Sequence, residues 1–146
     1  MARRQDLIDH LGKVPLFSRC TGRELRIVAR HAEAVRLPEG SVLFSEGDTG
    51  DAFYVVLDGT AEVRKGKADR RVNSLGRGAY FGEMALLDAA PRSATVVAAT
   101  ELELAVLGAR IFRTLLRELP TISERMLAAL AGELREARRS QDVPTA

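Results

Sequence analysis

The sequence is long enough, at 146 residues, for one domain with a full hydrophobic core, and it is too short for two. Apolar residues make up 46% of it and charged residues 29%, a balance typical of globular proteins and not of disordered chains. The formal net charge is only +2, so we expect neither nucleic acid nor a membrane surface as the main partner.

The cysteine content and the start of the chain favour a soluble, cytoplasmic protein. Cys20 is the only cysteine, which excludes a disulfide framework and indicates a reducing compartment. No apolar run follows the first arginines, so we expect no signal peptide, and no apolar stretch approaches the roughly 20 residues of a membrane span. His10 and His31 lack the spacing of metal ligands, and no Ser-His-Asp arrangement is suggested. We therefore expect no metal, no cofactor and no enzymatic activity.

Residues 1–32 are predicted to be helical. Thr21 is a good N-cap for a helix, and Glu24 stands three residues later as the second half of a capping box. Leu25, Val28 and Ala29 then recur at helical spacing. A short amphipathic helix is therefore expected directly after Thr21.

Residues 33–107 are predicted to be rich in strands, because Gly, Pro and Asp cut them into short segments. The pair Asp58-Gly59 lies between two β-rich runs at 53–57 and 60–64, which predicts a hairpin across that pair. The basic residues of 64–71 are expected at a hairpin tip. Seven or eight short strands at this spacing imply a closed or double-sheet β architecture, since either protects the strand edges.

Residues 108–140 are predicted to be helical again. One short helix should end before Pro120, and Thr121 should cap the next helix, with Glu124 three residues later. That second helix is long and carries one apolar stripe at four-residue steps. The stripe consists of Ile122, Met126, Leu130 and Leu134.

The most informative stretch is 80–96. Gly82 follows a strand-like run and precedes five residues that favour helix, and backbone N–H groups at such a turn can hold an anion. The guanidinium of Arg92 suits two phosphate oxygens, and Ser93 adds a hydroxyl. The carboxylate of Glu83 suits a sugar hydroxyl. These groups together describe a nucleotide site, and the alternative is an ordinary surface ion pair between Glu83 and Arg92.

Two segments of this stretch have the sequences Phe81-Gly82-Glu83-Met84-Ala85-Leu86-Leu87 and Pro91-Arg92-Ser93-Ala94-Thr95-Val96. They closely resemble the phosphate-binding cassette of cyclic-nucleotide-binding domains, and 47–59 resembles the glycine-rich strand-turn-strand region of the same family. The resemblance implies a mainly β fold with flanking α-helices, a double-stranded β-helix (jelly-roll) barrel with N-terminal helices and a long C-terminal helix. We expect a single domain over residues 1–140, with helices at 1–32, the barrel at 33–107, helices at 108–140 and a loose tail at 141–146.

The resemblance also implies roles for individual residues. Arg92 matches the arginine that binds the cyclic phosphate, and Glu83 matches the acid that accepts the ribose 2′-hydroxyl. The remaining matched ligand-binding positions are Phe81, Gly82, Met84, Ala85, Ser93 and Ala94. Ser93 permits cyclic AMP or cyclic GMP, with cyclic AMP preferred. The base is expected under the last helix, at Leu130 or Leu134, for which core packing or a dimer seam is an equal alternative.

These expectations favour a regulatory, non-enzymatic module that binds a cyclic nucleotide and signals through its C-terminal helices. One alternative is a ligand-free barrel used for protein interaction or dimerisation. Another is the N-terminal sensor fragment of a larger transcription factor or enzyme. Few residues follow Arg139, so we expect no DNA binding by this chain itself. A homodimer through the last helix and contact with a downstream effector domain both stay open.

Overall fold

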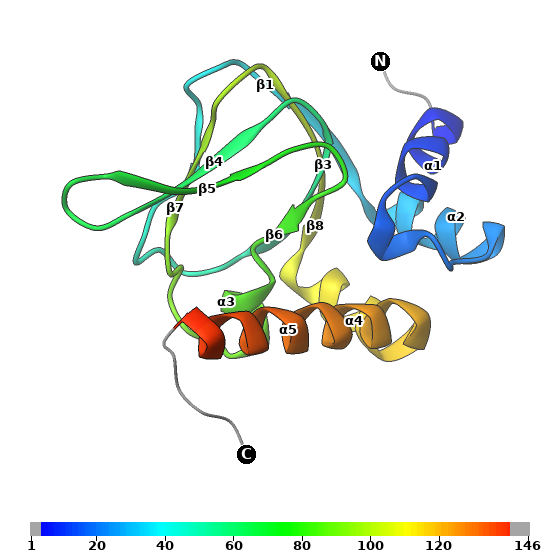
Figure 1. Cartoon of the computed structure of the whole chain (residues 1–146). Helices are drawn as coiled ribbons and strands as arrows, with labels where there is room; N and C mark the ends of the chain where they lie inside the picture. The colour runs from blue at the N-terminus through cyan, green and yellow to red at the C-terminus, as the bar shows by residue number, and fades with distance from the viewer. Residues whose placement is uncertain (1–3, 141–146) are drawn as a thin grey trace.

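A computed structural model describes residues 4–140, so the tail expected at 141–146 lies outside the described residues. Figure 1 shows a β-barrel with helices on one side and beneath it. The strands are β1 (Glu33–Leu37), β2 (Val42–Phe44), β3 (Ala52–Asp58), β4 (Ala61–Lys65), β5 (Arg70–Leu75), β6 (Tyr80–Phe81), β7 (Thr95–Ala98) and β8 (Leu102–Gly108). The helices are α1 (Arg4–Gly12), the 3-10 helix η1 (Pro15–Phe17), α2 (Gly22–His31), α3 (Glu83–Leu87), α4 (Ala109–Glu118) and α5 (Pro120–Ser140).

The strands form two four-stranded sheets, in the orders β1-β8-β3-β6 and β2-β7-β4-β5. Every pairing within them is antiparallel. The N-terminal helices pack at one side, and α3, α4 and α5 lie below the barrel (Figure 1). The predicted fold class, mainly β with flanking helices and a long C-terminal helix, is confirmed.

Strand β3 is apolar on both faces because it separates two hydrophobic clusters. Successive side chains of a strand point to opposite faces. Phe53, Val55 and Leu57 therefore join a cluster with the helices, whereas Tyr54 and Val56 face the barrel interior. Each face of β3 therefore packs in a separate hydrophobic cluster.

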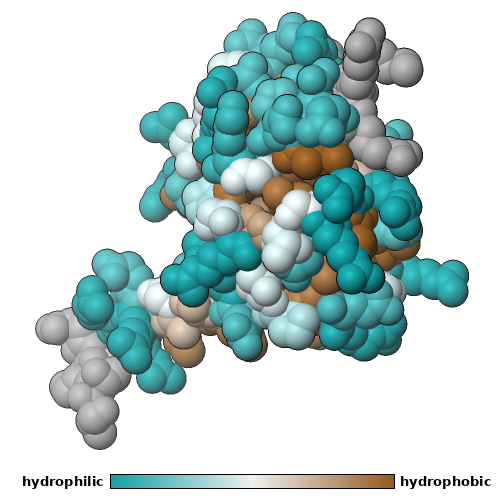
Figure 2. Space-filling model, turned by 90° about the vertical axis from the view of Figure 1, so that its right-hand side faces the viewer, coloured by the Kyte–Doolittle hydropathy of each residue, from teal (hydrophilic) through white to brown (hydrophobic). Residues whose placement is uncertain are grey.

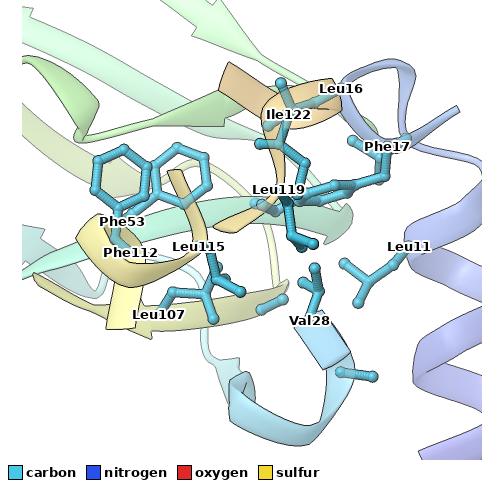
Figure 3. Close-up of a cluster of buried hydrophobic side chains, with 14 of the residues drawn as sticks. Leu11, Leu16, Phe17, Val28, Phe53, Leu107, Phe112, Leu115, Leu119 and Ile122 are labelled. Atoms are coloured by element: carbon cyan, nitrogen blue, oxygen red, sulfur yellow. The ribbon is translucent and has the colours of Figure 1, made fainter. Parts of the chain in front are cut away.

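The helix-side cluster fixes the C-terminal helices to the sheet. The rings of Phe53 and Phe112 stack with centroids 4.7 Å apart, and Leu119 and Ile122 extend the contact towards Phe17 of η1 (Figure 3). The face that carries α1 and α2 is mostly hydrophilic, with apolar areas near its centre (Figure 2). Among the described residues, no helix combines the length and the apolar character needed to cross a bilayer.

The predicted hairpin across Asp58-Gly59 is wrong, because β3 and β4 belong to different sheets. A two-residue hairpin turn of the Asp-Gly type needs two residues with positive φ, and here only Gly59 has one. The turn instead packs on the loop before β8, where any side chain at position 59 would collide with the carbonyl of Glu101. The pair thus forms a corner from one sheet to the other. The hairpin with the basic tip, between β4 and β5, is present as predicted.

One predicted helix start is confirmed and one is wrong. The Thr21 hydroxyl accepts from the Glu24 backbone N–H at 3.1 Å, and the Glu24 carboxylate accepts from the Thr21 N–H at 2.8 Å, which completes the capping box. Helix α5, however, begins at Pro120, so Thr121 lies within its first turn and is not its cap. Proline has the helical φ already fixed and lacks the N–H that a first helical residue leaves unpaired, which explains the earlier start.

Candidate functional site

One cavity collects all eight ligand-binding residues predicted from the cassette. It has a volume of about 140 Å³ and lies between β6, α3 and the loop that leads into β7. Its lining includes Phe81, Gly82, Glu83, Met84, Ala85, Arg92, Ser93 and Ala94. Phe44, Val63 and Val96 complete the wall. The residues that sequence reasoning selected are therefore neighbours in space.

Gly82 makes the turn between β6 and α3 possible. Its φ is +91°, a left-handed conformation that side chains other than glycine rarely adopt. A Cβ at this position would lie 2.9 Å from Nη1 of Arg92 and 3.1 Å from the carbonyl oxygen of Ala52. Glycine therefore allows both the turn and the close approach of the Arg92 guanidinium.

Arg92 is buried, with 3% of its surface exposed. Its Nη1 donates to the carbonyl oxygen of Gly82 and its Nη2 to that of Ala52, both at 2.7 Å. The carboxylate of Asp51 lies 3.8 Å from Nη2 and is itself exposed. Nε of Arg92 is buried and has no hydrogen-bond partner. The cation is thus held in position while one of its three nitrogens has no hydrogen-bond partner.

Glu83 brings a carboxyl group into the same cavity, with only 7% of its surface exposed. Burial raises the pKa of this carboxyl, and the nearby charge of Glu133 on α5 adds to the rise. Its Oε2 is buried without a hydrogen-bond partner. Among the described residues, no ion pair joins Glu83 to Arg92, and both are buried, which rules out the surface-pair alternative in this structure.

The cavity also depends on residues that the sequence reasoning did not select as site residues. Phe44 reaches it because β2 pairs with β7, where Phe44 stands opposite Val96. Gly50 lets the loop before β3 approach α3, since a Cβ there would lie 2.7 Å from Cβ of Ala85. Gly50 and Asp51 belong to the glycine-rich stretch already noted, which was the one signal available for them. Nothing local in the sequence indicated Phe44.

The two leucines expected at the base lie outside this cavity. Leu130 and Leu134 line a separate groove of about 450 Å³ between α5 and α3. Met84 lines both the groove and the cavity. Leu134 is about half exposed, whereas Leu130 packs partly against the helix-side core. The structure therefore places them next to the site and not within it.

The chemistry available in the cavity is that of binding. A fixed guanidinium, a buried carboxylate and the backbone N–H groups after Gly82 can recognise an anion and a hydroxyl group together. In the described part of the chain, no group of three or more His, Cys, Asp or Glu residues could hold a metal ion.

A family model described as the cyclic nucleotide-binding domain matches residues 34–118, more than half of the chain. The chain belongs to this family. The match runs from the second residue of β1 to the end of α4. The cassette of this cyclic nucleotide-binding domain, with Glu83 and Arg92, lies inside the matched range.

Relatives of the domain include regulators from fungi and bacteria. The cAMP-dependent protein kinase regulatory subunit of Aspergillus niger is 41% identical over 123 residues, which cover 84% of this chain and 30% of that protein. The cyclic AMP receptor protein of Thermus thermophilus is 36% identical over 126 residues, covering 84% and 58% respectively. The chain thus spans about a third of the length of the fungal relative.

A solved structure of PKAR CBD2 with Sp-2Cl-cAMPS bound is also similar. It superposes with a TM-score of 0.79 at 26% identity, and the match covers 98% of this chain and 94% of that one. The similarity therefore extends beyond the barrel to the flanking helices, including α5.

Proposed function

We propose that the domain binds a cyclic nucleotide in the cavity between Glu83 and Arg92. The observation that carries the proposal is a pair of buried, oppositely charged side chains that line one cavity and keep an unpartnered polar atom each. Buried polar groups are nearly always hydrogen-bonded in folded proteins. Oε2 of Glu83 and Nε of Arg92 are therefore well suited to contacts with a ligand.

Each cassette residue has a role in this proposal. Arg92 binds the cyclic phosphate, with help from the backbone N–H groups that follow Gly82. Glu83 accepts a hydrogen bond from the ribose 2′-hydroxyl. Phe81, Met84, Ala85, Ser93 and Ala94 complete the contacts around the sugar and the phosphate.

We favour cyclic AMP over cyclic GMP as the ligand. Ser93 permits either base, so the preference comes from the relatives. The two curated relatives described above are named for cyclic AMP, and the similar PKAR domain was solved with Sp-2Cl-cAMPS. The base itself would leave the small cavity past Met84 and enter the groove of Leu130 and Leu134.

The output of binding would be a shift in the position of α5. A ligand moves such an equilibrium only when it binds the two positions unequally. A base held between α3 and α5 would contact α5 in one position and not in the other, which supplies this difference. We therefore propose that residues 1–140 act as one regulatory, non-catalytic domain. Its signal would be transmitted either to a second copy of the chain that packs against α5 or to an effector domain.

Titration calorimetry tests the proposal. We expect heat of binding on addition of cyclic AMP, binding with lower affinity for cyclic GMP, and no heat of binding with the open-chain nucleotide 5′-AMP. Replacement Arg92→Ala should weaken cyclic AMP binding by about 2–5 kcal/mol, the usual cost of truncating one partner of a buried charged contact. A ligand-free interaction barrel, the main alternative, predicts no heat with either cyclic nucleotide at high micromolar concentration.

A further inference from the structure

The guanidinium of Arg92 is held on its face as well as on its edges. Its central carbon lies 4.1 Å from the centroid of the Phe44 ring, within the range of a cation–π contact. The ring of Tyr54 is farther away, at 5.9 Å. Arginine is the cation that most readily stacks on an aromatic ring, because its guanidinium is planar and weakly hydrated.

Phe44 is itself fixed by two other rings. Its centroid lies 5.7 Å from that of Tyr54 and 6.1 Å from that of Phe81, and those two rings stack at 5.1 Å. The three residues come from β2, β3 and β6, so two different sheets contribute to the cluster. The chain has only five Phe and two Tyr, and three of these seven gather beside one buried cation.

Burial of a cation is costly unless it is compensated. The guanidinium of Arg92 contacts two backbone carbonyl oxygens and, at 3.8 Å, an exposed carboxylate. The carbonyls of Gly82 and Ala52 fix two points of the guanidinium edge but leave its plane free to tilt. A ring packed against the face removes that freedom. The orientation of Nε, the nitrogen without a hydrogen-bond partner, is then set before any ligand arrives.

We infer that Phe44 is a positioning residue for nucleotide binding, which acts by holding the guanidinium plane of Arg92 ready for the phosphate. The inference rests on the proposed function. Preorganisation of this kind increases affinity because the ligand does not have to order the side chain on binding. Phe44 therefore contributes to phosphate recognition from outside the cassette.

The first test compares cyclic AMP affinity in Phe44→Leu and Phe44→Tyr by calorimetry. We expect the leucine variant to bind about 3- to 30-fold more weakly, in line with the loss of one desolvated cation–π contact. The tyrosine variant keeps the ring and should stay within about twofold of the wild type. The matched control is Phe53→Leu, which removes a buried ring from the helix-side cluster and should leave affinity near that of the wild type.

The second test separates positioning from direct contact with the ligand. In an Arg92→Gln background no cation remains, so Phe44→Leu should change the residual affinity by less than about twofold. If the leucine variant does not fold, pentafluorophenylalanine at position 44 keeps the ring shape while reversing its electrostatics, and it should weaken binding in the wild-type background only. The inference would be overturned if substitution of Phe44 lowered cyclic AMP affinity equally in the wild-type and Arg92→Gln backgrounds, or in neither. Absence of cyclic AMP binding by the wild type would instead refute the proposed function.

Discussion

Glu83 and Arg92 bring two buried, ionisable side chains to one cavity without pairing with each other. The fold opposes the ionised form of Glu83, because burial and the neighbouring Glu133 both raise its pKa. A hydroxyl group that donates to the carboxylate would offset this cost. The free domain therefore tolerates an unfavourable group whose partner we propose to be the ligand.

A neutral replacement of Glu83 should stabilise the ligand-free domain while it weakens ligand binding. At low pH the carboxyl of Glu83 is protonated in both the folded and the unfolded state, so its ionisation does not affect the free energy of unfolding. Because its pKa is raised in the folded state, ionisation of Glu83 destabilises the fold as the pH rises through the raised value. Glu83→Gln should therefore raise the melting temperature of the ligand-free domain at about pH 8, and the gain should shrink towards about pH 4. A gain that grows on acidification would contradict this reasoning.

The same variant should bind cyclic AMP about 10- to 100-fold more weakly, since it loses a hydrogen bond to a charged acceptor. Affinity of the wild type should also fall at low pH, as Glu83 becomes protonated. Calorimetry at both pH values measures the two effects. Unchanged affinity in Glu83→Gln would exclude the proposed contact with the ribose.

At the residue scale, the sequence predicted residues that line one cavity, including Glu83 and Arg92, but not Phe44, which strand pairing brings to the same cavity. Glu83 and Arg92 both lie in the stretch 80–96, whose residue order resembles a known motif. Phe44 joins them only because β2 pairs with β7 in a particular register. No local pattern specifies which distant strand becomes a neighbour, so the aromatic cluster was not predictable.

At the scale of elements, the turn between β6 and α3 can be tested with two glycines of similar backbone. Gly82 and Gly66 have φ of +91° and +81°, but only Gly82 would place a Cβ against Arg92 and Ala52. Gly66→Ala should cost about 1 kcal/mol from backbone strain alone. Gly82→Ala should cost about 1–3 kcal/mol and also weaken cyclic AMP binding. Chemical denaturation and calorimetry of both variants check this, and equal behaviour would refute the role of the close approach.

The contribution of α5 to base binding can be tested on two exposed leucines of that helix. Leu134 lines the groove beside Met84, whereas Leu127 is exposed and does not line it. If the base packs against α5, Leu134→Ala should weaken cyclic AMP binding by up to about tenfold through lost apolar burial. Leu127→Ala serves as the control and should bind like the wild type. Equal affinities of the two variants would place the base elsewhere.

Element prediction succeeded where the signal was local. The capping box of Thr21 and Glu24 forms within one helical turn, and it is present as expected. The composition of the Asp58-Gly59 pair is typical of a hairpin turn, which explains the wrong prediction. The packing of Gly59 against Glu101 decides its actual role as a corner, and that contact is distant in sequence.

For the whole molecule, the alternation of short strands and turns was enough to predict a mainly β fold with flanking helices. The strand orders β1-β8-β3-β6 and β2-β7-β4-β5 could not be predicted from the residues, because they pair strands that lie far apart in the sequence, such as β1 with β8. The resemblance of the cassette to a known family supplied the jelly-roll expectation. The fold then brings the cassette, β2 and α5 to the same end of the barrel.

A crystal structure of the domain with cyclic AMP would show directly where the phosphate and the ribose bind. We expect the cyclic phosphate within hydrogen-bonding distance of Arg92 and the ribose 2′-hydroxyl within hydrogen-bonding distance of Glu83. A different cavity, of about 500 Å³, lies between η1 and α5 and is lined by Arg19, Arg125 and Tyr80. A nucleotide bound there, or one whose phosphate points away from Arg92, would contradict the proposed roles of Arg92 and Glu83.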